Sequence, residues 1–95
     1  MAYRLTNAAA DDVTAIFARG AAEFGLAQAE KYHAGLERIF EFLAANPRAA
    51  RERGEFSPPV RLHPFGVHVV VYRIVGDDIL VVRVPHGRQD WQSWL

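Results

Sequence analysis

The residues most able to do chemistry lie close together near the C-terminal end of the sequence. Arg83 ends an apolar run, and the short polar stretch after it contains His86, Arg88 and Asp90. Arginine pairs bidentately with phosphate or carboxylate groups, and histidine changes its charge near neutral pH. One interpretation is a cationic pocket with a titratable histidine, suited to phosphate or RNA. The other is structural: Arg83 pairs with Asp90 or Glu55 to hold the end of the chain, and His86 bonds the end of the strand.

Other catalytic patterns are absent from the sequence. There is no cysteine, which excludes a thiol nucleophile and disulfide bonds. There is no glycine-rich phosphate loop, and no HExxH motif or Cys/His ligand set. Ser57 and Ser93 have no evident base and orienting acid. The four histidines fall on different predicted elements, so we predict no metal site and no cofactor.

Length and composition indicate a single folded domain that spans residues 1–95. The chain is 51% hydrophobic and 23% charged, as is typical of globular proteins. It starts without the pattern of a signal peptide, and no apolar run approaches the roughly 18 residues of a membrane span. We therefore expect a cytoplasmic protein that does not enter a membrane. The formal net charge is zero, whereas a duplex-binding face usually needs a positive excess.

The first half of the sequence predicts one strand and two helices that would position this cluster. Residues 3–6 have the character of a short strand, and Thr6 is a good N-cap for the helix after it. Apolar residues then recur at helical spacing as far as Gly25, a suitable C-terminal stop. A second helix follows at once and ends at Asn46–Pro47, because proline disfavours a helical residue before it. Two helices joined by so short a turn must form an antiparallel hairpin.

The second half predicts a small sheet. Residues 47–59 read as a proline-rich connector with one helical turn at 48–53. The segments that follow are rich in β-branched residues and predict strands at 60–63, 67–74 and 79–84, the last two joined by a turn at 75–78. The order β-α-α-β-β-β gives an α+β fold, with a helical hairpin packed on a small, mainly antiparallel sheet.

Two questions about this sheet stay open in the sequence. The last two strands are apolar on both faces, and the helical hairpin covers one, so a binding partner or the C-terminal tail must cover the other. The length of the last turn decides whether Arg73 and Arg83 share a face. A two-residue turn would place them on opposite faces, and a three-residue turn on one.

Several short motifs resemble the ParE branch of the ParE/RelE toxin superfamily in their order and spacing. The motifs are FGLAQAEKY at 24–32, VVVYR at 69–73 and RVPHGRQD at 83–90, and the resemblance covers the chain from about Tyr3 to Asp90. It implies a toxin of a type II toxin–antitoxin pair that inhibits DNA gyrase by protein–protein contact and is not an enzyme. It also implies a ParD-like antitoxin that forms a hetero-oligomer with the toxin and binds operator DNA, which the toxin contacts only through it.

The resemblance implies two protein-binding surfaces. The predicted target-binding residues are Arg83, His86, Arg88, Asp90, Trp91 and Trp94. The predicted antitoxin-binding residues are Phe17, Phe24, Tyr32, Phe40, Arg61 and Arg73. Tryptophan beside arginine is typical of interaction hot spots; the alternative is that both tryptophans pack the tail onto the sheet.

The RelE branch, whose members cut messenger RNA in the ribosome, is the alternative function. Such a nuclease needs a base, cations and an acid around the scissile phosphate. Arg61, Arg83 and His86 could compose a reduced site with Glu55 as the base. The chain departs from the strongest nucleases of that branch because its one lysine, Lys31, lies on the second helix.

Overall fold

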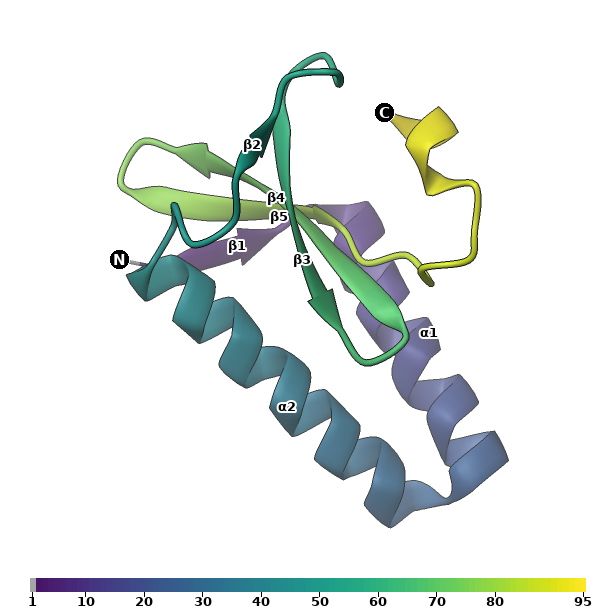
Figure 1. Ribbon diagram of the computed structural model, residues 1–95. Coiled ribbons are helices and arrows are strands. Elements are labelled where there is room, and N and C mark those ends of the chain that lie inside the picture. The colour runs from purple at the N-terminus through teal and green to yellow at the C-terminus, as the bar shows by residue number, and fades with distance from the viewer. Residues whose placement is uncertain (1) are drawn as a thin grey trace.

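The computed structural model describes residues 2–95 and shows two long helices beside a five-stranded sheet (Figure 1). The elements in chain order are β1 (Tyr3–Leu5), α1 (Asn7–Phe24), α2 (Leu26–Ala45), β2 (Glu52–Arg53), β3 (Val60–Phe65), β4 (His68–Val75), β5 (Asp78–Arg83) and the 3₁₀ helix η1 (Trp91–Trp94). The strand order is β1-β5-β4-β3-β2, with β1 parallel to β5 and every other neighbouring pair antiparallel. The predicted α+β fold with a mainly antiparallel sheet is confirmed.

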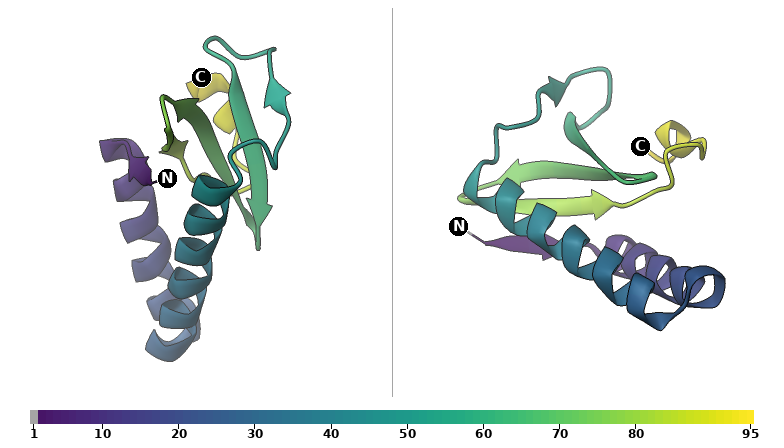
Figure 2. Two further views of the ribbon diagram at one scale, coloured as in Figure 1. Left: turned by 90° about the vertical axis from the view of Figure 1, so that its left-hand side faces the viewer. Right: turned by 60° about the horizontal axis from the view of Figure 1, so that its bottom comes forward.

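The helical hairpin begins and turns at the residues that the sequence indicates. The hydroxyl of Thr6 accepts a hydrogen bond from the N–H of Ala9 at 3.0 Å and donates to the carbonyl of Val82 at 2.7 Å. This one side chain therefore caps α1 and ties its start to β5. Gly25 separates the helices with a φ of 91°, which glycine adopts without a steric penalty. The helices run antiparallel (Figure 2), and neither is long and apolar enough to cross a membrane, among the residues described.

The helical turn predicted at 48–53 is wrong. A single hydrogen-bonded turn follows α2, and Glu52–Arg53 then forms β2, which pairs with the start of β3. The cause lies in the sheet: Glu52 pairs with Arg61 and Arg53 with Val60, so this segment takes an extended conformation. The guanidinium of Arg61 also donates to the carbonyl of Ala50 at 2.6 Å and holds the preceding residues against β3.

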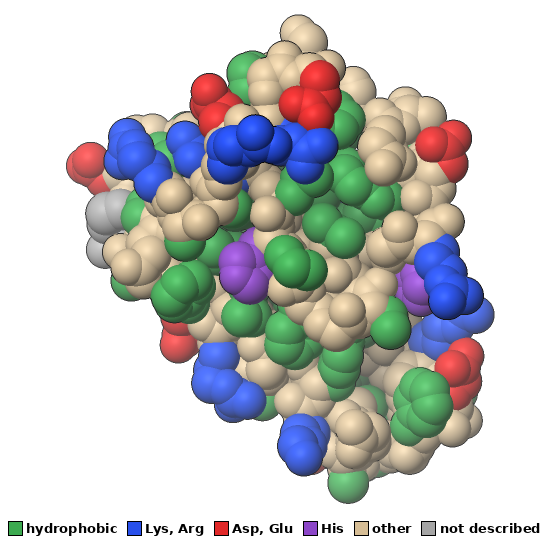
Figure 3. Space-filling model, in the orientation of Figure 1, with side chains coloured by type: hydrophobic (Ala, Val, Ile, Leu, Met, Phe, Trp, Pro, Cys, Tyr) green, Lys and Arg blue, Asp and Glu red, His purple; other side chains and the backbone are tan. Residues whose placement is uncertain are grey.

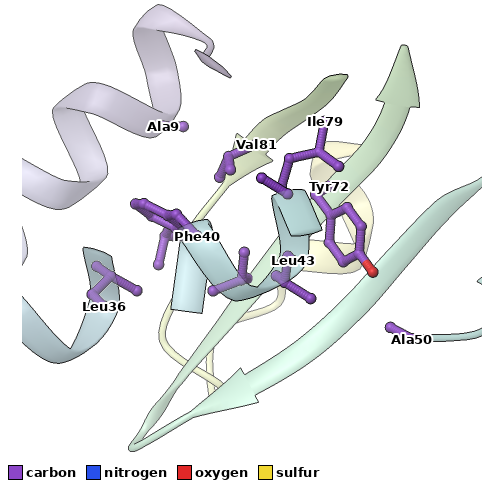
Figure 4. Close-up of a cluster of buried hydrophobic side chains, with 11 residues drawn as sticks. Ala9, Leu36, Phe40, Leu43, Ala50, Tyr72, Ile79 and Val81 are labelled. Atoms are coloured by element: carbon purple, nitrogen blue, oxygen red, sulfur yellow. The ribbon is translucent and has the colours of Figure 1, made fainter. Parts of the chain in front are cut away.

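The main core lies between the helices and one face of the sheet. Its largest buried side chains come from α2, β4 and β5 (Figure 4): Leu36, Phe40, Leu43, Tyr72, Ile79 and Val81. Tyr72 is fully buried, and its hydroxyl donates to the carbonyl of Pro47 at 2.8 Å. That bond satisfies the polar tip, as a buried tyrosine requires.

The opposite face of the sheet is covered in part by the C-terminal segment, which lies on the side away from the helices (Figure 2). Val60, Val71 and Trp91 form a second buried cluster there, with Phe56 and Leu95 packed against it. The sequence left open whether a binding partner or the C-terminal tail covers this face. The structure shows that the tail covers part of it.

A bulge decides the relation between the two arginines of the last hairpin. The turn has two residues, Gly76 and Asp77, with a φ of 63° at the glycine. A two-residue turn alone would put Arg73 and Arg83 on opposite faces. The register shifts at Val71, however, so that Arg83 pairs with Val71, which lies two residues from Arg73 on the same strand. The shifted register therefore puts Arg73 and Arg83 on the same face of the sheet, whereas the turn length alone would put them on opposite faces.

Candidate functional site

Arg83 is held by Asp12, a residue of α1. The guanidinium donates to both carboxylate oxygens, from Nε to Oδ2 at 2.8 Å and from Nη2 to Oδ1 at 3.0 Å. The side chains of Arg83 and Asp12 are 27% and 18% exposed. The hydrogen bond with Asp12 raises the pKa of Arg83. The structural interpretation is right that Arg83 forms an ion pair, but wrong about the partner, which is neither Asp90 nor Glu55.

The two tryptophans of the tail differ in their surroundings. Trp91 is 6% exposed and packs in the second buried cluster. Trp94 is 42% exposed, and the guanidinium carbon of Arg83 lies 4.1 Å from the centre of its ring. This is a cation–π contact on one face of the indole. Trp91 therefore anchors the tail to the sheet, whereas Trp94 keeps accessible surface beside an arginine.

Backbone hydrogen bonds hold the chain after β5 against the start of β4. The N–H of Val69 donates to the carbonyl of Pro85 at 3.0 Å, and the N–H of Gly87 donates to that of Val67 at 2.8 Å. His86 lies between these bonds and is half-buried. Two of the predicted target-binding residues follow it and are exposed: Arg88 and Asp90.

A polar pair joins α2 to the sheet. The hydroxyl of Tyr32 donates to the carbonyl of Phe65 at 3.1 Å and lies 2.7 Å from Nδ1 of His68. Burial lowers the pKa of His68, the nearby ring of His86 lowers it further, and the carboxylate of Asp12 opposes both. Burial also raises the pKa of Tyr32. His68 is therefore held mainly neutral at neutral pH, where it can bond the tyrosine.

The predicted antitoxin-binding aromatics of the helical hairpin lie at three different depths. Phe24, at the tip of the hairpin, is 70% exposed, and its neighbour Leu26 is 59% exposed. Phe17 is half-buried, with its ring centre 5.9 Å from that of His33. Phe40 is only 2% exposed and belongs to the main core. Sequence periodicity placed all three phenylalanines on apolar stripes and missed Leu26.

Arg61 and Arg73 lie at the end of the sheet near β2. Both line a shallow hollow together with Glu52, Pro58 and Pro59. On the face seen in Figure 3, basic side chains gather in a band near this end, with hydrophobic side chains beside and below them. The arrangement is an apolar surface with arginines at its rim, which suits a partner with acidic groups.

Comparisons with known proteins identify the family. Residues 3–91 match the family model described as the ParE toxin of the type II toxin–antitoxin system, parDE. The chain belongs to this family of toxins. Toxin ParE1 of Mycobacterium tuberculosis (strain CDC 1551 / Oshkosh) is 40% identical over 68 residues, which cover 70% of this chain and 69% of that protein. Toxin ParE3 of Caulobacter vibrioides is 32% identical over 60 residues, which cover 63% and 60%.

A solved structure agrees with the fold. The structure titled "Chromosomal ParDE TA system from P. aeruginosa" superposes with a TM-score of 0.74, covering 90% of this chain and 95% of that chain at 24% identity. At this identity the likeness shows the fold alone. The resemblance to the ParE branch that the sequence motifs carry is confirmed.

The residues of the alternative nuclease site each have a different partner in this ParE-family chain. Glu55 pairs with Arg53 at 2.7 Å, and the hydrogen bond from that arginine lowers the pKa of Glu55. Arg61 donates to the backbone near the end of α2, whereas Arg83 is bound to α1. Nδ1 of His86 accepts from a backbone N–H two residues further on. Within residues 2–95, no three His, Asp or Glu side chains lie close enough to hold a metal ion.

Proposed function

We propose that this ParE-family toxin inhibits DNA gyrase by protein–protein contact, without catalysis, and that a ParD-type antitoxin keeps it inactive. The observation that supports this proposal most concerns the partners of the four residues that a nuclease would need. Each of Glu55, Arg61, Arg83 and His86 is engaged by a different neighbour. A scissile phosphate would need a base and cations converging on one point.

The antitoxin-binding surface that we propose combines the helical hairpin with the basic end of the sheet. Phe24 and Leu26 are exposed apolar groups at the hairpin tip, and Tyr32 lies farther along α2. An amphipathic segment could lay its apolar face along the hairpin from these groups and extend to Arg61 and Arg73, at the other end of α2, which would receive acidic residues. The matching solved structure is titled a ParDE system, which supports a ParD-type partner. We propose that this partner forms a hetero-oligomer with the chain and that the chain contacts operator DNA only through it.

The gyrase-binding surface that we propose is the C-terminal segment. Trp94 and Arg83 form a stacked pair with an open indole face, the combination found at interaction hot spots. Arg88 and Asp90 add exposed charges to the same segment. Trp91 contributes indirectly, because its burial keeps the segment on the sheet.

The test is a supercoiling assay with purified gyrase and purified chain. We expect the chain to block supercoiling and to leave translation in a cell extract intact, and we expect added ParD-type antitoxin to restore supercoiling. The matched variants are Trp94→Ala, which should weaken inhibition, and Arg19→Ala, on an exposed helix position far along the chain, which should not. Cleavage of ribosome-bound messenger RNA that is lost in His86→Ala, with gyrase unaffected, would show the RelE-type activity instead.

A further inference from the structure

Asp12 is the link between the helical hairpin and the C-terminal segment (residues 85–95). We propose that Asp12 is a positioning residue: it fixes Arg83, and through Arg83 it orients the indole of Trp94 toward the target. The identity of that target rests on the proposed function. The fixing of the segment itself does not, because it follows from contacts within this chain.

Asp12 uses both carboxylate oxygens on the end of β5. Oδ2 accepts from Nε of Arg83 and from the backbone N–H of Val84, each at 2.8 Å, and Oδ1 accepts from Nη2 of Arg83 at 3.0 Å. Hydrogen bonds to an ionised carboxylate are the strong ones, and a bidentate pair also fixes orientation. The carboxylate is 18% exposed, so solvent and salt screen it less than a surface pair. The direction of the Arg83 side chain is therefore set from α1.

Arg83 passes this direction on to Trp94. Its edge faces Asp12, and its guanidinium carbon lies 4.1 Å from the centre of the Trp94 ring. A planar guanidinium can hold a carboxylate with its edge and an aromatic ring with its face, whereas an ammonium group cannot do both. Trp94 is thus oriented by a side chain that is itself held at both edge nitrogens.

The other contacts of η1 do not explain the position of the Trp94 ring. Trp91 is buried on the sheet, but it lies at the opposite end of a four-residue helix. The hydroxyl of Ser93 donates to the carbonyl of Asp90 at 2.8 Å, a bond within the segment. Leu95, which follows Trp94, packs against the second buried cluster and holds the main chain at the end of the segment. Neither Trp91 nor Leu95 fixes the direction of the Trp94 ring between them, so that direction depends on the stack with Arg83.

A fixed indole matters for binding because ordering a large side chain at an interface costs free energy. A ring that is already oriented in the free protein avoids that cost. Asp12 would contribute to affinity in this way without contacting the target, since its oxygens are used inside the chain. Loss of the Asp12 charge should free the Trp94 ring and loosen the end of η1, and should therefore weaken target binding. Antitoxin binding at the distant hairpin tip should not change.

The first experiment measures the order of the segment by hydrogen exchange, comparing wild type with Asp12→Asn and with the control Asp11→Asn. Asp11 is the neighbouring, exposed carboxylate of the same helix turn. We expect the amide of Leu95, which bonds the carbonyl of Gln92 at the end of η1, to exchange about tenfold faster in Asp12→Asn, as loss of a charge-assisted bond implies, with the control unchanged. Arg83→Lys, which keeps the charge but not the forked geometry, should give the same acceleration. Equal exchange in wild type and Asp12→Asn would overturn the inference, whatever the target.

The second experiment is a mutant cycle on inhibition of supercoiling. Asp12→Asn and Trp94→Ala should each raise the half-inhibitory concentration about tenfold, and the double variant should be no worse than Trp94→Ala, because both changes act on one contact. Antitoxin affinity should stay within about twofold of wild type, which shows that the fold is intact. Independent, multiplying effects would overturn the positioning role. A wild-type chain that leaves gyrase untouched would overturn the proposed target, and the exchange experiment would still decide the role of Asp12.

Discussion

Gly66, in the turn between β3 and β4, is the position where one added methyl group should disturb the contact between α2 and the sheet. Its φ is 55°, and a Cβ there would lie 2.5 Å from the hydroxyl oxygen and 2.8 Å from a ring carbon of Tyr32. Gly66→Ala should therefore both strain the backbone and push the tyrosine away from its bonds to the carbonyl of Phe65 and to His68.

The expected cost can be built from these two parts. A left-handed conformation costs a residue with a Cβ roughly 1–2 kcal/mol. Displacing Tyr32 adds about 1 kcal/mol for each hydrogen bond lost and about 1 kcal/mol or more for overpacking. The free energy of unfolding should thus fall by about 4 kcal/mol, a large part of the roughly 5–15 kcal/mol that is usual for a domain.

Two other glycines allow the cost of backbone strain to be separated from the cost of displacing Tyr32. Gly76 has a similar φ of 63° but no atom within 4 Å of the place that a Cβ would occupy, so Gly76→Ala should show the strain alone. Gly54 has neither a left-handed φ nor a close neighbour, and alanine there should be neutral or stabilising by about 0.5 kcal/mol. Urea unfolding with an unchanged m-value measures all three variants. Equal destabilisation by Gly66→Ala and Gly76→Ala would refute the reasoning, because the Tyr32 contact would then contribute nothing.

Three further predictions follow from exposure and burial. Phe24→Ser should leave the free energy of unfolding within about 0.5 kcal/mol of wild type, because the ring is 70% exposed, yet it should weaken antitoxin binding by calorimetry; unchanged affinity would remove Phe24 from the antitoxin surface. Because burial lowers the pKa of His68 in the folded chain, the unfolded chain binds that proton more tightly, so the free energy of unfolding should fall as pH drops below about 6.5. In urea unfolding at several pH values, His68→Gln should lack this part of the pH dependence. Trp91→Ala should cost about 3–5 kcal/mol and Trp94→Ala less than about 1 kcal/mol in thermal unfolding; the reverse order would mean that the roles of the two rings are exchanged.

Local patterns account for most of what the sequence predicts correctly. Thr6 and Gly25 have strong helix-boundary preferences, and the structure uses both as a cap and a turn. Strand β4 is rich in β-branched residues, and its centre is buried by packing on both faces. The helical turn predicted at 48–53 is wrong because Glu52 and Arg53 pair with β3, a tertiary contact that local propensity does not contain.

The candidate site depends on contacts that cross the whole chain, and these were harder to predict. Asp12 and Arg83 are 71 residues apart, and an aspartate early in a helix is explained equally well by the helix dipole. The register shift at Val71 changes the face on which Arg83 lies, which turn length would otherwise fix. The burial of Trp91 and the exposure of Trp94 likewise follow from where the tail crosses the sheet, which composition does not specify.

The parallel pairing of β1 with β5 joins the two ends of the chain in one sheet. Tyr3 sits opposite Ile79, and the N–H of Thr6 bonds the carbonyl of Val81 at 3.0 Å. During synthesis the first strand must therefore stay unpaired until residues 78–83 have left the ribosome, and contacts of such long range form slowly. The sheet of this toxin is thus completed late, which gives an antitoxin an interval in which to bind the chain.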